Sequence, residues 1–253
     1  SLDIDLVVEG DGICFAETLA EKFDGQTVSY EKFGTSTLML KNQFNVDVAT
    51  ARTENYSYPA ALPKVEPSNI QLDLARRDFT INSMAIKLCG KGIFSLIDLY
   101  DGENDLRNGL IKVLHDRSFI DDPCRIFRAI RFEQRFGFCV EGQTQSYIEK
   151  AVEDNLIGQL SGDRLINEIK LLLSEPEPVR CVNRMKEFLL LQKIAPEIFG
   201  EDFNWIIMER VRDALAWANT ISLPRKPEAW FVYLYILFMV KEDDVFERMM
   251  TRM

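Results

Sequence analysis

The first part of the chain has the alternation of apolar and polar residues that is typical of strands. In residues 2–8 every second side chain is apolar, and Asp3 and Asp5 fall between them on the opposite face. The pattern then predicts one amphipathic helix and two β-rich runs at hairpin spacing: residues 13–23, 35–40 and 44–50. The expected order is therefore strand, helix, strand, strand.

Residues 52–69 contain three prolines and little periodicity, so a long loop with a functional role is expected there. Three short β-rich runs follow that loop: residues 81–88, 93–99 and 110–114.

From Phe119 onward the hydrophobic period changes from two to about 3.6 residues, and no further strand is predicted. Helices are expected near residues 121–136, 143–153, 161–174, 178–191, 205–219 and 228–240. A strand-rich front joined to a helical rear predicts an α+β enzyme head on a helical body.

The composition is that of an ordinary globular protein, because 47% of the 253 residues are hydrophobic and 28% are charged. The formal net charge of -10 excludes a histone-like nucleic-acid binder, so any anionic polymer must meet a local basic patch. The longest apolar run, residues 230–240, is shorter than the about 20 residues of a membrane span. It predicts a buried helix, and no membrane partner is expected.

Cysteine and histidine usage narrows the chemistry. Five scattered cysteines without a C-x-x-C pair support neither a disulfide framework nor a thiolate zinc site, and a reducing cytoplasm fits best. His115 is the only histidine, so zinc sites built on several imidazoles lack ligands. Catalysis, if present, is expected to rest on carboxylates.

Asp3 and Asp5 leave the predicted strand on one face, where their carboxylates can bind a divalent ion. Hard oxygen ligands in an open arrangement suit Mg²⁺, which takes further ligands from water and substrate phosphates. Asp47 lies on another predicted strand, and an adjacent position would bring a third carboxylate to the pair. The alternative is that all three acids are simply solvated.

A short polar cluster follows at residues 76–82. The guanidinium groups of Arg76 and Arg77 can donate paired hydrogen bonds to triphosphate oxygens. The carboxylate of Asp78 and the amide of Asn82 suit ribose hydroxyls. On charge alone, a salt-bridged helix end explains the cluster equally well.

The predicted helix at 121–136 carries Asp122, Arg125 and Arg128 along one side, next to an apolar stripe. The simplest interpretation is a solvated face with an ion pair between Asp122 and Arg125. A chemical interpretation also exists, because cytosine and adenine present an amine donor beside a ring-nitrogen acceptor. A fixed carboxylate and a fixed guanidinium would match these two bases and oppose uracil and guanine, so the protein could select a nucleotide without a template.

Four motifs occur in a fixed order: D-x-D at Asp3, R-R-D-F-T-x-N at Arg76, D-x-x-D-G-x-x-D-L at Asp98 and D-D-P-x-R-x-x-R-A-x-R-F at Asp121. In this order they resemble the class II tRNA nucleotidyltransferase and bacterial poly(A) polymerase family. The motifs span residues 3 to about 138. Each motif alone is a moderate or weak indication of the family, but the four together are highly specific for it.

The resemblance implies a DNA polymerase β-like nucleotidyltransferase head followed by all-helical neck and body domains. The expected ranges are 1–116 for the head, 117–175 for the neck with its base-recognition helix, and 176–253 for the body. The implied metal-binding residues are Asp3 and Asp5, with Asp47 as a third catalytic acid. The implied nucleotide-binding residues are Arg76, Arg77, Asp78, Asn82, Asp122, Arg125 and Arg128.

The chain departs from the family pattern in three places. The glycine-rich G-G-x-V-R-D segment that precedes D-x-D in the family is absent, and Asp121 stands where many relatives have Glu. The sequence also stops soon after the apolar run at 230–240. We therefore expect an N-terminal piece and part of the body or tail to be missing from this sequence.

The resemblance implies an enzyme that uses Mg²⁺ and ATP, and in some members CTP, to extend the 3′ end of tRNA. The sequence does not distinguish a complete CCA-adding enzyme from an A-adding or a CC-adding specialist. Poly(A) polymerase is the alternative within the family, although a more basic C-terminal region would be expected for it. A non-catalytic RNA-binding relative or a nucleotide sensor is an alternative from another class. The presence of both Asp3 and Asp5 favours an enzyme, and the sequence carries no information on the oligomeric state.

Overall fold

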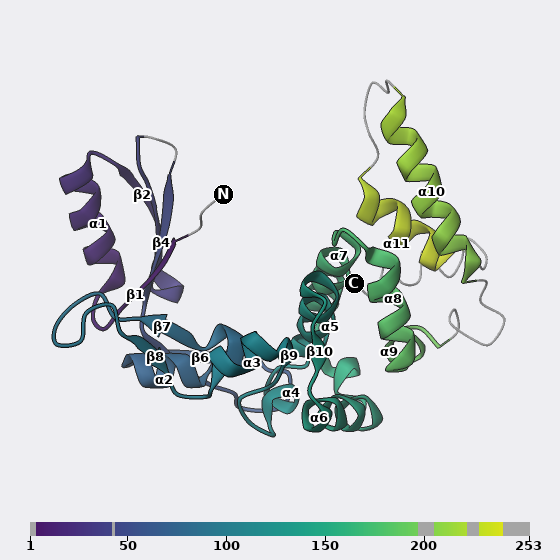
Figure 1. Ribbon diagram of the computed structural model, residues 1–253, viewed down its shortest axis with the longest axis horizontal. Helices are drawn as coiled ribbons and strands as arrows, with labels where there is room; N and C mark the ends of the chain where they lie inside the picture. Colours follow the sequence, from purple (N-terminus) through teal and green to yellow (C-terminus); the bar gives the residue numbers. More distant parts are fainter. Residues whose placement is uncertain (1–3, 42–43, 197–204, 222–227, 240–253) are drawn as a thin grey trace. The chain divides into compact units, whose positions relative to one another are not determined.

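The computed structural model describes residues 4–41, 44–196, 205–221 and 228–239. The chain forms two compact units, the first built from Ser1–Ser57 with Leu62–Gly102 and the second from Tyr58–Ala61 with Glu103–Met253. Strands dominate the first unit and helices the second (Figure 1). The predicted α+β architecture is therefore confirmed, while the boundaries at 116 and 175 stay predictions.

The first unit contains a four-stranded mixed sheet in the order β1-β4-β3-β2. β1 (Ile4–Val8) runs parallel to β4 (Asn45–Thr50), and β3 (Thr35–Met39) is antiparallel to β4 and to β2 (Gln26–Tyr30). The predicted hairpin of β3 and β4 is confirmed. The sequence missed β2, because this edge strand leaves four of its five side chains exposed and has no apolar alternation.

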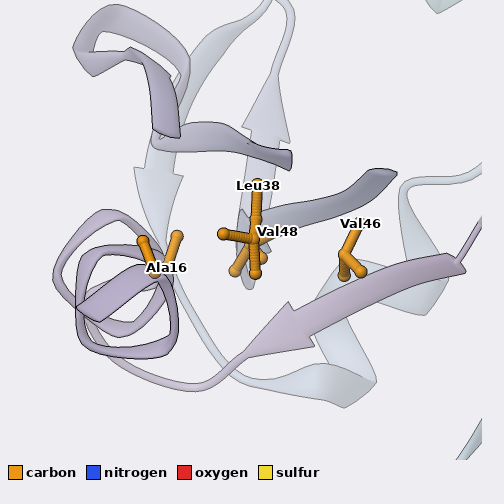
Figure 2. Close-up of a cluster of buried hydrophobic side chains, with 5 residues drawn as sticks. Ala16, Leu38, Val46 and Val48 are labelled. Carbon is orange, nitrogen blue, oxygen red and sulfur yellow. The ribbon is translucent and has the colours of Figure 1, made fainter. Parts of the chain in front are cut away.

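α1 (Gly12–Phe23) covers one face of this sheet. Asp11 caps the helix by accepting hydrogen bonds from the backbone N–H groups of Ile13 and Cys14, at 3.0 Å each. The core between helix and sheet consists of Ala16, Ala20, Leu38, Val46 and Val48, four of which are labelled in Figure 2. Because side chains alternate along a strand, the residues between these core positions point to the face away from α1.

The predicted loop over residues 52–69 is partly wrong, because it contains two paired strands. β5 (Arg52–Asn55) and β6 (Lys64–Pro67) form an antiparallel ribbon with Arg52 opposite Pro67. Strands of four residues are too short to show an apolar alternation in the sequence. Both strands of a two-stranded ribbon are edge strands, where a proline is tolerated. The unit continues with α2 (Ile70–Ala75), η2 (Thr80–Asn82), β7 (Met84–Ile86) and β8 (Leu96–Asp98).

The second unit is almost entirely helical. Its helices are α3 (Gly102–Asn108), whose first residue belongs to the first unit, α4 (Ser118–Asp121), α5 (Cys124–Phe136), α6 (Gly142–Glu153), η3 (Leu156–Gln159), α7 (Gly162–Leu173), α8 (Pro178–Glu187), α9 (Leu190–Ile194), α10 (Ile206–Thr220) and α11 (Ala229–Met239). The helix predicted over 178–191 is divided, because Leu189 adopts a left-handed conformation with φ of 59°.

One expectation for the second unit is wrong. β10 (Cys139–Val140) pairs in parallel with β9 (Leu110–Ile111), although no strand was predicted after Phe119. Two residues are too few to produce a period in the sequence. Among the described residues, no helix is long and apolar enough to cross a membrane.

α5 lies at the centre of the second unit and packs against α7 and α8. Its side chains Ile126, Phe127 and Ile130 are fully buried, as the predicted apolar stripe requires. The fixed position of α5 determines where its polar side points.

Candidate active site

Asp5 and Asp47 are register partners on the adjacent parallel strands β1 and β4. Neighbouring strands lie about 4.8 Å apart, and register partners project from the same face. Both residues are exposed, on the face opposite Val46 and Val48, which pack under α1. The structure thus brings Asp47 beside Asp5, whereas Asp3 lies outside the described residues.

Thr37 is the register partner of Asp47 on the other side, in β3. Its Oγ1 donates a hydrogen bond to Oδ1 of Asp47 at 2.6 Å. Thr37 could not be identified from the sequence, because nothing in a single strand shows which residue of the next strand it faces.

The donor set of this face fits a divalent cation. In the part of the chain that the structure describes, no group of three or more His, Cys, Asp or Glu residues is placed to hold a metal. Asp5 and Asp47 nevertheless supply two exposed carboxylates at adjacent positions. Such an open pair of hard ligands suits an ion that keeps several waters and binds substrate phosphates.

Arg76 and Arg77 are both held by the buried carboxylate of Asp73. Arg76 donates to Oδ1 of Asp73 from Nε at 3.0 Å and from Nη2 at 2.7 Å. Arg77 donates to Oδ2 from Nη2 at 3.2 Å. Arg76 and Arg77 therefore form a salt-bridged helix end with Asp73 at the end of α2, which is the alternative that the sequence left open.

Glu54 on β5 forms the second support of this cluster. Its Oε1 accepts from Nη1 of Arg76 at 2.9 Å, and its Oε2 accepts from the hydroxyl of Tyr56 at 2.9 Å. The side chain of Arg76 is 18% exposed and that of Arg77 is 30% exposed. Arg77 is therefore the more accessible of the two for a ligand, and a nucleotide role for both stays a prediction.

Asp78 and Asn82 close a tight turn around η2. Oδ1 of Asp78 accepts from the backbone N–H of Phe79 at 2.9 Å and from Nδ2 of Asn82 at 3.0 Å. Arg77 donates from Nη1 to the carbonyl of Asn82 at 3.2 Å. Since Asp78 is buried, its first role in this structure is to shape the turn.

The D-x-x-D-G turn packs against the same segment. Oδ1 of Asp98 accepts from the backbone N–H of Gly102 at 2.9 Å. A Cβ atom at Gly102 would lie 2.3 Å from the carbonyl oxygen of Thr80, so only glycine fits. The two motifs are thereby held in contact within the first unit.

In the second unit, Asp122 makes two contacts through one oxygen. Its Oδ1 accepts from the backbone N–H of Cys124 at 2.9 Å, at the start of α5, and from Nη2 of Arg164 at 2.6 Å. Arg164 on α7 also donates from Nη1 to the carbonyl of Ala60 at 2.7 Å. Arg164 could not be identified from the sequence, because its partners Asp122 and Ala60 are far away along the chain.

Arg125 is 5% exposed and donates from Nη1 to the hydroxyl of Ser118 at 2.8 Å. The structure therefore gives Asp122 an ion pair with Arg164 and gives Arg125 a hydroxyl partner. Arg128 is half-buried, with its guanidinium 5.5 Å from the ring centroid of Phe132. Reading of a base by these residues stays a prediction.

Two further arginines of α5 are tied to Glu175, which follows α7. Arg131 donates to it from Nε at 3.0 Å, and Arg135 donates from Nε at 2.8 Å and from Nη2 at 2.7 Å. Burial acts to raise the pKa of Glu175, but hydrogen bonds from Arg135 and Arg131 lower this pKa below its ordinary value. On α7, burial raises the pKa of Glu168, against the positive charges of Arg128 and Arg131.

Comparison with known proteins gives matches along the whole chain. Residues 1–112 match the poly(A) polymerase head domain family, and residues 137–200 match the family described as the probable RNA and SrmB-binding site of polymerase A. An A-adding tRNA nucleotidyltransferase of Geobacter sulfurreducens is 42% identical over 251 residues, which is 99% of this chain and 28% of the relative. The chain therefore spans less than a third of that protein.

Solved structures show the same similarity. The apo form II structure of a CCA-adding enzyme matches 100% of this chain and 59% of its own length, with 39% identity and a TM-score of 0.91. A tRNA nucleotidyltransferase in complex with a primer tRNA and an incoming ATP analogue matches 100% of this chain and 71% of its own, with 32% identity and a TM-score of 0.82.

Proposed function

Because the chain belongs to the family of class II tRNA nucleotidyltransferases and bacterial poly(A) polymerases, we propose that it is a template-independent nucleotidyltransferase that adds AMP from ATP to the 3′ end of tRNA. The observation that carries this proposal is the pairing of Asp5 with Asp47 on one exposed face. The similarity to an A-adding enzyme over nearly the whole chain supports the choice of AMP.

The family implies the use of a divalent metal ion, and we infer that the ion is Mg²⁺. Asp5 and Asp47 would hold it, together with Asp3, which precedes Asp5 by two positions. When bound, such an ion supplies activation of the primer 3′-hydroxyl and charge neutralisation at the phosphates. The chain's own part is to orient the two carboxylates toward one point.

Arg77 and Arg76 are proposed to bind the triphosphate. Asp73 fixes their guanidinium groups, so little side-chain freedom would be lost when a nucleotide binds. Asp78 and Asn82 are proposed to support this segment and to contact the ribose.

Asp122 and Arg125 are proposed to select the base. The carboxylate of Asp122 would accept from the exocyclic amine of adenine, and Arg125 would donate to the ring nitrogen. Arg128 is proposed to contribute positive charge beside them.

Addition of both CMP and AMP is the second candidate, favoured by the similarity to the CCA-adding enzyme structure. Incubation of the full chain with labelled nucleotides and three RNA ends distinguishes the candidates. An A-adding enzyme transfers AMP only, to tRNA that ends in C-C, and a CCA-adding enzyme also transfers CMP to tRNA that ends in the discriminator base. Long A tails on a generic RNA end would identify a poly(A) polymerase, and no transfer at all would contradict the proposal.

A further inference from the structure

Asp5, Asp47 and Thr37 form one row across the neighbouring strands β1, β4 and β3. The hydroxyl of Thr37 donates to Oδ1 of Asp47 at 2.6 Å, a length typical of a hydrogen bond to a charged carboxylate. This contact engages Oδ1 from the β3 side. Oδ2 of Asp47 is thus the oxygen left for a ligand.

We propose that Thr37 is a positioning residue that fixes the Asp47 carboxylate for divalent cation binding. Thr37 acts through Asp47 and does not itself ligate the cation. This inference deepens the proposed function and rests on its assignment of the cation to Asp5 and Asp47.

The local structure makes Thr37 suited to this role. Ser36 and Leu38 on either side of it are buried, so the backbone of β3 is anchored at this point. A β-branched side chain in a strand has a restricted χ1 angle, which keeps its hydroxyl in one place. An exposed aspartate without such a partner would rotate between several rotamers and would lose that freedom on binding a cation.

The same strand offers a matched control. Thr35 lies two residues before Thr37 and therefore on the same face, but its register partner on β4 is Ala49. Thr35→Val removes the same hydroxyl group from the same strand without touching Asp47. Thr37→Ser keeps the hydroxyl and serves as the conservative variant.

The test measures Mn²⁺ binding to the full chain without nucleotide, by the electron paramagnetic resonance signal of free Mn²⁺. Loss of a residue that orients a metal ligand commonly weakens metal binding by about 10- to 100-fold. We expect Thr37→Val to weaken Mn²⁺ binding by about that factor and Thr35→Val to bind nearly as the wild type does. Thr37→Ser, which keeps the hydroxyl but not the β-branch, should lose much less affinity than Thr37→Val. Thermal unfolding of each variant shows that the fold is retained.

A double-mutant cycle separates positioning from a general effect on the sheet. If Thr37 acts only through Asp47, then Thr37→Val adds no further loss in an Asp47→Asn background. As a second measurement, the Mg²⁺ concentration for half-maximal nucleotide addition should rise in Thr37→Val, with little change in the rate at saturating Mg²⁺.

The inference would be overturned by wild-type Mn²⁺ affinity in Thr37→Val, by an equal loss in Thr35→Val, or by additive losses in the double mutant. Wild-type affinity in Asp47→Asn would overturn it as well. If the Thr37 variants behave as expected but the wild type extends no RNA, the proposed function fails and the positioning role stands.

Discussion

Arg164 on α7 holds Asp122 at the start of α5, with 2.6 Å between Nη2 and Oδ1. The same guanidinium donates from Nη1 to the carbonyl of Ala60 at 2.7 Å. Asp122 is thus fixed by a residue 42 positions later in the chain, and by the N–H of Cys124, the first residue of α5. A carboxylate fixed from two sides presents its remaining oxygen in one direction.

Arg164→Ala should therefore reduce base selection more than total activity. A hydrogen bond to a charged group contributes about 1.5–3 kcal/mol, which corresponds to about 10- to 150-fold. We expect the ratio of kcat/KM for ATP over GTP to fall by about tenfold or more, and Arg180→Ala, an exposed arginine on α8, serves as the control. An unchanged ratio in Arg164→Ala would mean that this contact is only structural.

Asp122→Ala and Arg125→Ala test the proposed selection of the base directly. A site that hydrogen-bonds a group can reject analogues that lack it by about 10⁴, whereas shape alone gives about 10². The ratio of kcat/KM for ATP over GTP should drop by orders of magnitude in both variants. Because Arg125 is buried against Ser118, its variant should also unfold more easily. If both variants lose only stability and keep their selectivity, another residue selects the base.

Asp5→Asn and Asp47→Asn should abolish nucleotide transfer and leave the fold intact, because both side chains are exposed on the face away from α1. Without the metal ion the transition state loses several kcal/mol of stabilisation, so the activation free energy rises. Each 1.36 kcal/mol of that rise lowers the rate about tenfold. Single-turnover addition to tRNA measures the rate, and circular dichroism checks the fold. Mg²⁺-dependent transfer at the wild-type rate in either variant would rule out the proposed metal site.

Asp73→Asn should destabilise the protein and weaken ATP binding together, because the buried carboxylate of Asp73 holds both Arg76 and Arg77. Removing one partner of a buried ion pair costs about 3–5 kcal/mol, and the partial exposure of the two arginines places the expected loss near the lower value. Urea unfolding and the KM for ATP are the measurements. Glu66→Gln, which breaks the exposed pair with Lys64, should change the stability far less, because solvent screens that pair.

Glu175 predicts a pH dependence of stability. Its pKa in the folded state lies below the ordinary value of 4.5, so the stability that it contributes is present above that pH and is lost as the pH falls through the folded pKa. Glu175→Gln should therefore be less stable than the wild type at pH 7, and the difference should shrink as the pH falls below about 4.5. Urea unfolding across this pH range measures the difference, and Glu153→Gln, at an exposed position of α6, serves as a control. A difference that stays constant with pH would contradict this role.

The α+β class, the helix with the apolar stripe of Ile126, Phe127 and Ile130, and the order of the motifs all follow from the sequence alone. These features are local. The helical period of apolar residues in α5 is encoded within a few consecutive residues. The same is true of the alternation in β1 that places Asp5 opposite the apolar side.

Which side chains meet depends on how the chain folds in three dimensions. Thr37 reaches Asp47, Glu54 reaches Arg76 and Arg164 reaches Asp122 across separations of 10, 22 and 42 residues. A period in the sequence shows which face of a strand or helix is apolar, but it does not contain the register between strands or the packing of one helix on another. For that reason the candidate acids and arginines could be recognised from the sequence, whereas the residues that hold them in place could not.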